Sequence, residues 1–158
     1  VWSGKPWDEN IDPIGPPPVQ SNGPELILGG FVPVALQRAA RLADGLVTAT
    51  NDPGQIDQSF RLVEQTWKEV GRSGKPRLIA QIDIGLETAH ADRALDNVMA
   101  YYKAMPPYDT YKASALIRTD QQLRDILKAV EQLDADEVVL FTWSTDIDQI
   151  ERIADIIG

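Results

Sequence analysis

The chain has 158 residues, a hydrophobic content of 43% and a formal net charge of −9 at pH 7, from 15 basic and 24 acidic residues. This composition is typical of one folded domain, and the negative charge argues against a nucleic acid or an anionic membrane as the main partner. The absence of cysteine excludes disulfides, thiol nucleophiles and cysteine-ligated metals, and it suggests a cytoplasmic location.

The first 24 residues differ from the rest because they hold six of the 11 prolines. Proline fixes φ and removes a backbone donor, so residues 1–24 are predicted to form an extended arm or loop. The chain starts at Val1 without a methionine or a signal-peptide pattern, which suggests an internal start. Residues 25–158 are predicted to form the folded domain, and no apolar run reaches the roughly 20 residues of a membrane span.

From residue 25 onward, short apolar runs alternate with helical patterns. Strands are predicted at residues 26–28, 46–50, 77–84 and 137–142. Helices are predicted to begin at Pro33, near Ile56, at Glu87 or Thr88, after Thr119 and after Ser144 or Thr145. The segment 108–118 is ambiguous between a short helix and a loop.

Two of the predicted helices carry sharper signals. Thr119, followed three residues later by Gln122, is typical of a capping box. In the last helix, Ile147, Ile150, Ala154 and Ile157 recur at helical spacing and are predicted to face inward.

The alternation of four strands with helices predicts an α/β fold with a parallel sheet and right-handed crossovers. A doubly wound sheet of the flavodoxin type and a section of a (β/α) barrel both fit this pattern. Periodicity alone does not choose between them.

The first strand ends in Gly29 and Gly30, directly before the helix that starts at Pro33. Glycine lets backbone amides approach an anion closely, and a helix N-terminus favours negative charge, so a phosphate site is expected here. A tight structural turn is the alternative. Thr48 and Thr50 end the next strand, at the rim where ligands of parallel sheets usually lie, although turn formation also explains polar residues at this point.

The third strand has two distinct faces. Leu78, Ala80, Ile82 and Ile84 share one face, and Ile79, Gln81 and Asp83 share the other. If the apolar set faces helices, Asp83 points into a barrel or cleft near its rim and is a candidate catalytic carboxylate. Its alternative role is structural pairing. A single histidine, His90, gives no basis for a metal site.

Several motifs in fixed order resemble a known family. They are a proline-rich connection at residues 15–18, a strand ending in Gly29-Gly30, an Ala/Arg-rich helix over 33–43, an Ala-Asp-Gly strand entry at 43–45, and a closing strand at 136–141. In this order they resemble the C-terminal half of the luciferase-like, flavin-dependent monooxygenases and F420-dependent oxidoreductases. The resemblance extends over nearly the whole chain and is clearest at residues 15–50.

The resemblance implies a TIM (β/α)8 barrel that binds FMN or coenzyme F420 at its C-terminal rim and acts on a small organic substrate. It would make Gly29 and Gly30 part of a cradle for the cofactor phosphate, and it would add Thr48 and Thr50 as rim contacts. The reaction would be oxygen activation or hydride transfer.

Four predicted strands in the 134 residues from 25 onward amount to half of such a barrel, which typically needs about 250 residues. An alternative is therefore a non-catalytic half-barrel that binds a phosphorylated ligand or a partner subunit. Because a half-barrel has two open strand edges, the chain is expected to self-associate or to pair with another half-barrel.

Overall fold

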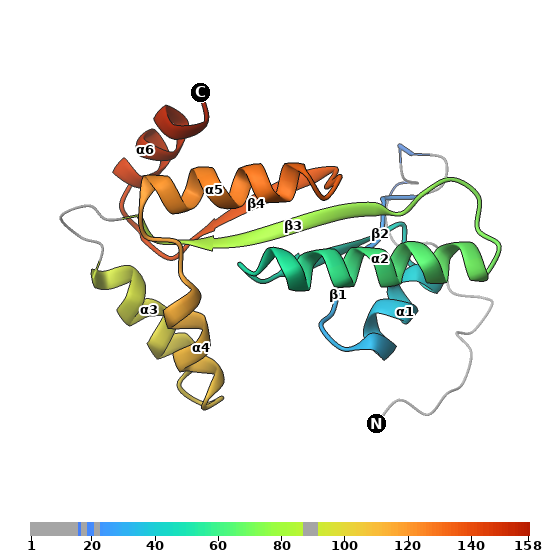
Figure 1. Cartoon of the computed structure of the whole chain (residues 1–158), viewed down its shortest axis with the longest axis horizontal. Helices are drawn as coiled ribbons and strands as arrows, with labels where there is room; N and C mark the ends of the chain where they lie inside the picture. The colour runs from blue at the N-terminus through green and yellow to red at the C-terminus, as the bar shows by residue number, and fades with distance from the viewer. Residues whose placement is uncertain (1–15, 17–18, 21–22, 87–91) are drawn as a thin grey trace.

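The computed structural model describes residues 16, 19–20, 23–86 and 92–158 (Figure 1). Most of the predicted arm, His90 and the predicted start of the third helix lie outside these residues. The division into an arm at 1–24 and a domain at 25–158 therefore stays a prediction.

Four strands form one parallel sheet: β1 (Ile27–Gly29), β2 (Gly45–Ala49), β3 (Arg77–Ile84) and β4 (Glu137–Thr142). They pair in chain order, β1-β2-β3-β4. A parallel crossover is right-handed, so a sheet that adds every new strand on the same side keeps its crossover helices on one face. A doubly wound sheet instead reverses its strand order and has helices on both faces. The order is that of consecutive units of a barrel, and it excludes the flavodoxin-like alternative.

Four helices cover that face of the sheet: α1 (Pro33–Leu42), α2 (Pro53–Glu69), α5 (Asp120–Glu131) and α6 (Asp148–Ile157). Two others, α3 (Asp92–Tyr102) and α4 (Tyr108–Ala115), lie at the carboxyl end of β3 (Figure 1). Helix α4 shows that most of the ambiguous segment 108–118 is a helix. Among the described residues, no helix combines the length and apolar character needed to cross a bilayer.

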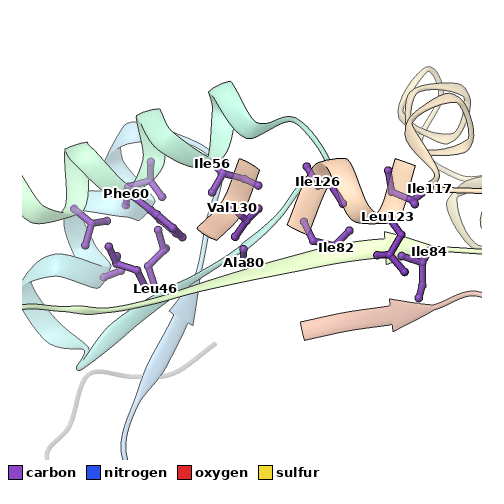
Figure 2. Close-up of a cluster of buried hydrophobic side chains, with 14 of the residues drawn as sticks. Leu46, Ile56, Phe60, Ala80, Ile82, Ile84, Ile117, Leu123, Ile126 and Val130 are labelled. Atoms are coloured by element: carbon purple, nitrogen blue, oxygen red, sulfur yellow. The ribbon is translucent and has the colours of Figure 1, made fainter. Parts of the chain in front are cut away.

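The core lies between the sheet and these four helices. Phe60 of α2 and Val130 of α5 pack on the same side of the sheet as Leu46 and Ile82 (Figure 2). Each large aliphatic or aromatic side chain buried in this way contributes about 1.5–3 kcal/mol. One cluster therefore holds the sheet to its helices and confirms the predicted apolar face of β3, since Leu78, Ala80, Ile82 and Ile84 all belong to it.

The opposite face of the sheet has no helical layer among the described residues. Val47, Ala49 and Gln81 are half-buried there, and Val139 and Phe141 of β4 are 36% and 44% exposed. In a closed barrel this face is the interior. Most inner side chains of this sheet are apolar, and Val139 and Phe141 are the most exposed of those on β4.

The capping box predicted at the start of α5 is confirmed. Thr119 Oγ1 accepts a hydrogen bond from Gln122 N at 3.2 Å, and Gln122 Oε1 accepts one from Thr119 N at 3.1 Å, which completes the capping box. Gly71 follows the C-cap of α2 with φ +74°, the left-handed conformation that favours glycine.

The prediction for the last helix is wrong in its start and its buried face. Helix α6 begins at Asp148, because Ser144 and Asp146 instead form a turn in which Ser144 Oγ accepts from Asp146 N at 3.1 Å. Its buried residues are Gln149 and Ile156. The Gln149 amide fixes this orientation, since it accepts from Leu86 N at 2.9 Å and donates to Leu86 O at 2.8 Å. The isoleucine stripe expected inside therefore faces outward.

Asp136 fixes the register between β3 and β4 at the amino end of the sheet. Its carboxylate accepts from Leu78 N at 2.9 Å and from Lys75 Nζ at 2.8 Å. The hydrogen bond from Lys75 holds the pKa of Asp136 below its usual value, against an opposing effect of burial and with further help from the Leu78 amide. A carboxyl with a lowered pKa in the folded state stabilises the fold above its unfolded pKa and loses that contribution as pH falls through the folded one.

We therefore expect Asp136→Asn to lower the free energy of unfolding by about 1 kcal/mol at pH 7. The difference from wild type should shrink below pH 4, as the wild-type carboxylate becomes protonated. Urea denaturation at several pH values measures this. A difference that stays constant between pH 7 and pH 3 would contradict the electrostatic origin.

Candidate functional site

The junction between β1 and α1 brings two glycines to the carboxyl rim of the sheet. A Cβ on Gly30 would lie 2.8 Å from the Cβ of Ala35, so only glycine lets the strand end pack this closely on the helix. A Cβ on Gly29 would meet Val47 at an ordinary 3.7 Å. The close approach at Gly30 brings the first turn of α1 directly over the strand end.

The N-termini of α1 and α2 differ in how their backbone amides are satisfied. The Asp52 carboxylate caps α2, accepting from Gly54 N at 2.8 Å and from Gln55 N at 3.3 Å. Helix α1 has Val32 at its N-cap and no side-chain cap. The first amides of a helix need partners from outside it. In α1, Pro33 has no N–H and Ala35 N donates to Val32 O at 2.9 Å, so among the described residues Val34 N is the amide of this turn that has no backbone partner.

Two cavities meet at Gly30 and Phe31. One, of about 270 Å³, lies between the starts of α1 and α2 and is partly lined by Thr48, Thr50 and Ser59. The other, of about 550 Å³, lies along the inner face of the sheet. The lining of this second cavity is mostly apolar and comprises Gly29, Gly30, Phe31, Val32, Ala35, Arg38, Val47, Ala49 and Gln81.

The structure thus brings three of the four predicted cofactor residues, Gly30, Thr48 and Thr50, to the smaller cavity, whereas Gly29 lines only the larger one. Both threonines are buried. Thr48 Oγ1 donates to Ile79 O at 3.5 Å, and Thr50 Oγ1 lies 3.4 Å from the hydroxyl of Tyr111. Thr50 Oγ1 also donates to Gln55 Oε1 at 3.5 Å. Each hydroxyl has a single proton, so it can donate to a ligand oxygen only after rotating away from its present acceptor.

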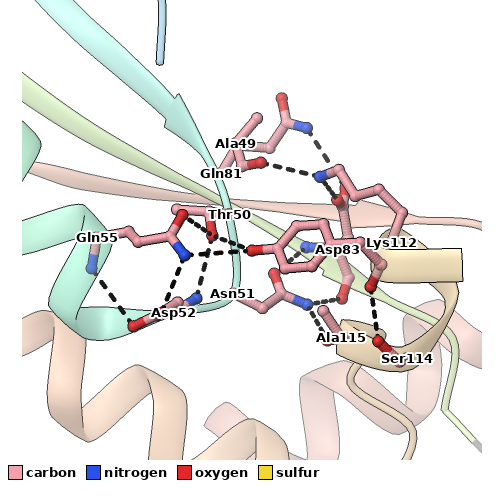
Figure 3. Close-up of polar contacts among 11 residues, drawn as sticks. Ala49, Thr50, Asn51, Asp52, Gln55, Gln81, Asp83, Lys112, Ser114 and Ala115 are labelled. Atoms are coloured by element: carbon pink, nitrogen blue, oxygen red, sulfur yellow. Dashed lines mark hydrogen bonds and ion pairs between the residues drawn. The ribbon is translucent and has the colours of Figure 1, made fainter. Parts of the chain in front are cut away.

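Asp83 lies at the carboxyl end of β3 in a buried ion pair with Lys112 of α4 (Figure 3). Lys112 Nζ also donates to Ala49 O at 2.9 Å. The Asn51 side chain completes the network: it accepts from Asp83 N at 2.8 Å and donates to Asp83 O at 2.7 Å and Ala115 O at 2.8 Å. The carboxylate therefore fixes α4 on the rim, while its catalytic role stays an untested prediction.

The sequence did not predict the ion pair of Lys112 or the hydrogen bonds of Asn51 to the backbone of Asp83 and Ala115. Lys112 stands four residues from both Tyr108 and Leu116, which places it on the inward side of its short helix. A lysine at such a position signals a buried partner. The ambiguous reading of segment 108–118 hid that signal.

Beside the larger cavity lies an aromatic cleft of about 400 Å³ between α3 and β4. Trp143 contacts Phe141, Tyr101 and Tyr102 through their rings at centroid distances of 5.3, 5.5 and 5.8 Å. Burial raises the pKa of Tyr102, with a smaller opposing effect of Lys112. Gln81 lines both this cleft and the larger cavity, so the two spaces adjoin at β3.

A sequence model of the luciferase-like monooxygenase family matches residues 2–155. The chain belongs to this family. Its barrel-type strand order is thus that of a luciferase-like monooxygenase fold. No curated protein matches the sequence significantly.

Solved structures support the same fold for this luciferase-like chain. An F420-dependent secondary alcohol dehydrogenase in complex with an F420–acetone adduct matches 78% of this chain and 44% of its own, with 14% identity and a TM-score of 0.59. The coenzyme F420-dependent tetrahydromethanopterin reductase from Methanopyrus kandleri matches 87% and 50%, with 14% identity and a TM-score of 0.60. Monooxygenase RslO1 from Streptomyces bottropensis matches 87% and 47%, with 13% identity and a TM-score of 0.61. The chain spans about half the length of each of these proteins.

The Asp83–Lys112 pair leads to a prediction about this luciferase-like rim. Lys112→Met leaves a buried carboxylate without its partner, so we expect a loss of about 3–5 kcal/mol in unfolding free energy. The double variant Asp83→Leu with Lys112→Met removes both charges and should recover most of that loss. Urea denaturation of the three proteins measures the coupling. Equal losses in the single and double variants would contradict a clamp built on the ion pair.

Proposed function

We propose that the chain is the cofactor-binding part of a flavin-dependent oxidoreductase or monooxygenase of the luciferase-like class. FMN or coenzyme F420 would be the cofactor, and the substrate a small organic molecule. The observation that carries this proposal is the pair of cavities that meet at Gly30, one polar and under an uncapped helix, the other apolar and along the sheet.

The two cavities suit the two ends of such a cofactor. Phosphate oxygens would accept hydrogen bonds from the Val34 amide in the first turn of α1 and, in the smaller cavity, from the Thr50 and Ser59 hydroxyls after these rotate away from their acceptors on Gln55. A planar ring system would lie in the larger one, against Val47, Ala49 and the Gln81 amide. Gly30 lines both cavities, so the two ends of the cofactor would meet at this residue.

When bound, the cofactor supplies hydride transfer or oxygen activation, and the residues of this chain bind and orient it. The apolar wall at Val47 and Ala49 excludes water from one side of the ring. The amide of Gln81 offers a donor and an acceptor to the ring edge. Asp83 and Lys112 would position the site indirectly. Their ion pair holds α4 in place, and α4 in turn holds Tyr111 against Thr50.

Activity needs the remaining strands of a barrel, whose rim loops complete the site. The outer edges of β1 and β4 pair with no further strand among the described residues. We therefore also propose that the chain associates with a second half-barrel, of its own or another sequence.

A cytoplasmic location accords with the absence of cysteine.

A non-catalytic half-barrel that binds a phosphorylated ligand is the second candidate function. The buried Asp83–Lys112 ion pair favours it, because the candidate catalytic carboxylate already has a structural partner. The two candidates differ in the rate at which oxygen reoxidises reduced FMN. Binding of reduced FMN with no change in that rate supports the non-catalytic function.

Cofactor binding should appear as a shift in melting temperature. At a concentration of FMN or F420 about 100-fold above its Kd, we expect stabilisation of about 2.7 kcal/mol, which is about 5–10 °C for a domain of this size. Gly29→Val should abolish the shift, because the fold has space for a Cβ there but the side chain fills the larger cavity.

Gln37→Ala on α1 is the matched control, because Gln37 is not among the residues that line either cavity, and it should retain the full shift. The proposal fails if neither cofactor shifts the wild-type melting temperature. It also fails if Gly29→Val binds as well as wild type.

A further inference from the structure

The two helices at the ends of the sheet each expose an apolar stripe. On α6, Ile147, Ile150 and Ile157 are 68%, 58% and 58% exposed, at the spacing of one helix face. On α1, Val34 and Leu42 are 72% and 68% exposed, eight residues apart. The sequence pattern of α6 is that of a buried face, yet this chain alone does not bury it.

The stripe on α6 faces away from the rest of the molecule. Arg152 points to α5, where its Nε donates to Asp120 Oδ1 at 2.9 Å. Arg152 is five residues from both Ile147 and Ile157, which is roughly 140° around the helix. The isoleucines therefore lie on the side opposite α5, where the next helix of a barrel would pack.

The exposed row on α1 faces the other open end. Val34, Arg38 and Leu42 recur every four residues and so share one side of the helix. Leu36, on another side, lines the cavity shared with α2. Arg38 also borders the cavity that includes Gly29 of β1. The row therefore lies toward the free edge of β1, and Figure 1 shows α1 and α6 at opposite ends of the fold.

The charges of these two surfaces are complementary. Helix α1 carries Arg38 and Arg41 and, alone among the described helices, no acidic residue, on a chain of net charge −9. Helix α6 exposes Glu151 and Asp155 beside its isoleucines. None of these four charged groups has an ion pair within the part of the chain that the structure describes. Helix α1 thus presents basic groups and helix α6 presents acidic groups, each beside exposed apolar side chains.

We propose that the partner at both ends is a second copy of this chain. The free edge of β4 would lie beside the free edge of β1 of the copy, and α6 would pack on α1 of the copy. A two-fold axis along the barrel repeats this junction, so both open edges of both copies close at once into eight parallel strands. This assignment rests on the proposed pairing of half-barrels and is independent of cofactor binding.

Sedimentation velocity without cofactor tests the proposal. We expect wild type to sediment as a species of twice the 17.5 kDa chain mass. The variant Ile150→Asp with Ile157→Asp should be monomeric, and its circular dichroism should match wild type because both positions are exposed.

Charge reversal identifies the partner surface. Reversing α1 with Arg38→Glu and Arg41→Glu should weaken the dimer at least about tenfold, and so should reversing α6 with Glu151→Arg and Asp155→Arg. The protein with all four changes should recover wild-type affinity. Lys68→Glu with Lys128→Glu changes the net charge as much as the α1 reversal does, on helices away from the junction, and should have no effect.

A wild-type monomer at all concentrations overturns the proposal. So does a dimer that survives the α6 aspartates, or one that the fourfold charge exchange does not restore, because both place the contact elsewhere. Association only after a half-barrel of different sequence is added also overturns it. In each of these cases the melting-temperature shift with FMN or F420 is measured independently. Failure of the dimer proposal is therefore distinguishable from failure of the cofactor proposal.

Discussion

The parallel pairing of four strands in chain order is the constraint on which the rest of this structure depends. It places α1, α2, α5 and α6 on one face of the sheet and, among the described residues, leaves most of the other face and both outer edges without a cover. The covered face is apolar and holds the fold together. The uncovered face carries Val47, Gln81 and Phe141, and the cavities lie on or beside it. In the proposed function the ring of the cofactor would lie on the uncovered face, whereas its phosphate would lie between α1 and α2, beside the apolar core.

The sequence predicted the elements whose signals are local. The capping box at Thr119 depends on contacts within a few residues, and the structure has it. The two faces of β3 were also predictable, because a strand alternates strictly. The candidate rim glycines followed from the same local logic, since a strand end and a helix start are adjacent in the chain.

The features that the sequence could not predict depend on distant partners. The orientation of α6 is fixed by Gln149, whose amide binds Leu86, 63 residues away in the chain. Lys112 finds Asp83 across 29 residues. In both cases a polar side chain decides which face is buried, and periodicity of apolar residues gives no information about that choice. The exposed isoleucines of α6 carry a pattern for burial that the single chain does not satisfy.

Asn51 behaves as one more peptide unit of the sheet. With its side-chain amide it both accepts from and donates to the backbone of Asp83, just beyond the point where the β2–β3 ladder ends at Ala49. Such mimicry depends on the NH₂ group, and asparagine is among the chemically labile residues. Deamidation at this position would turn a donor into an acceptor that faces the carbonyls of Asp83 and Ala115. Chemical ageing of a single side chain would thereby loosen the attachment of α4 to the rim.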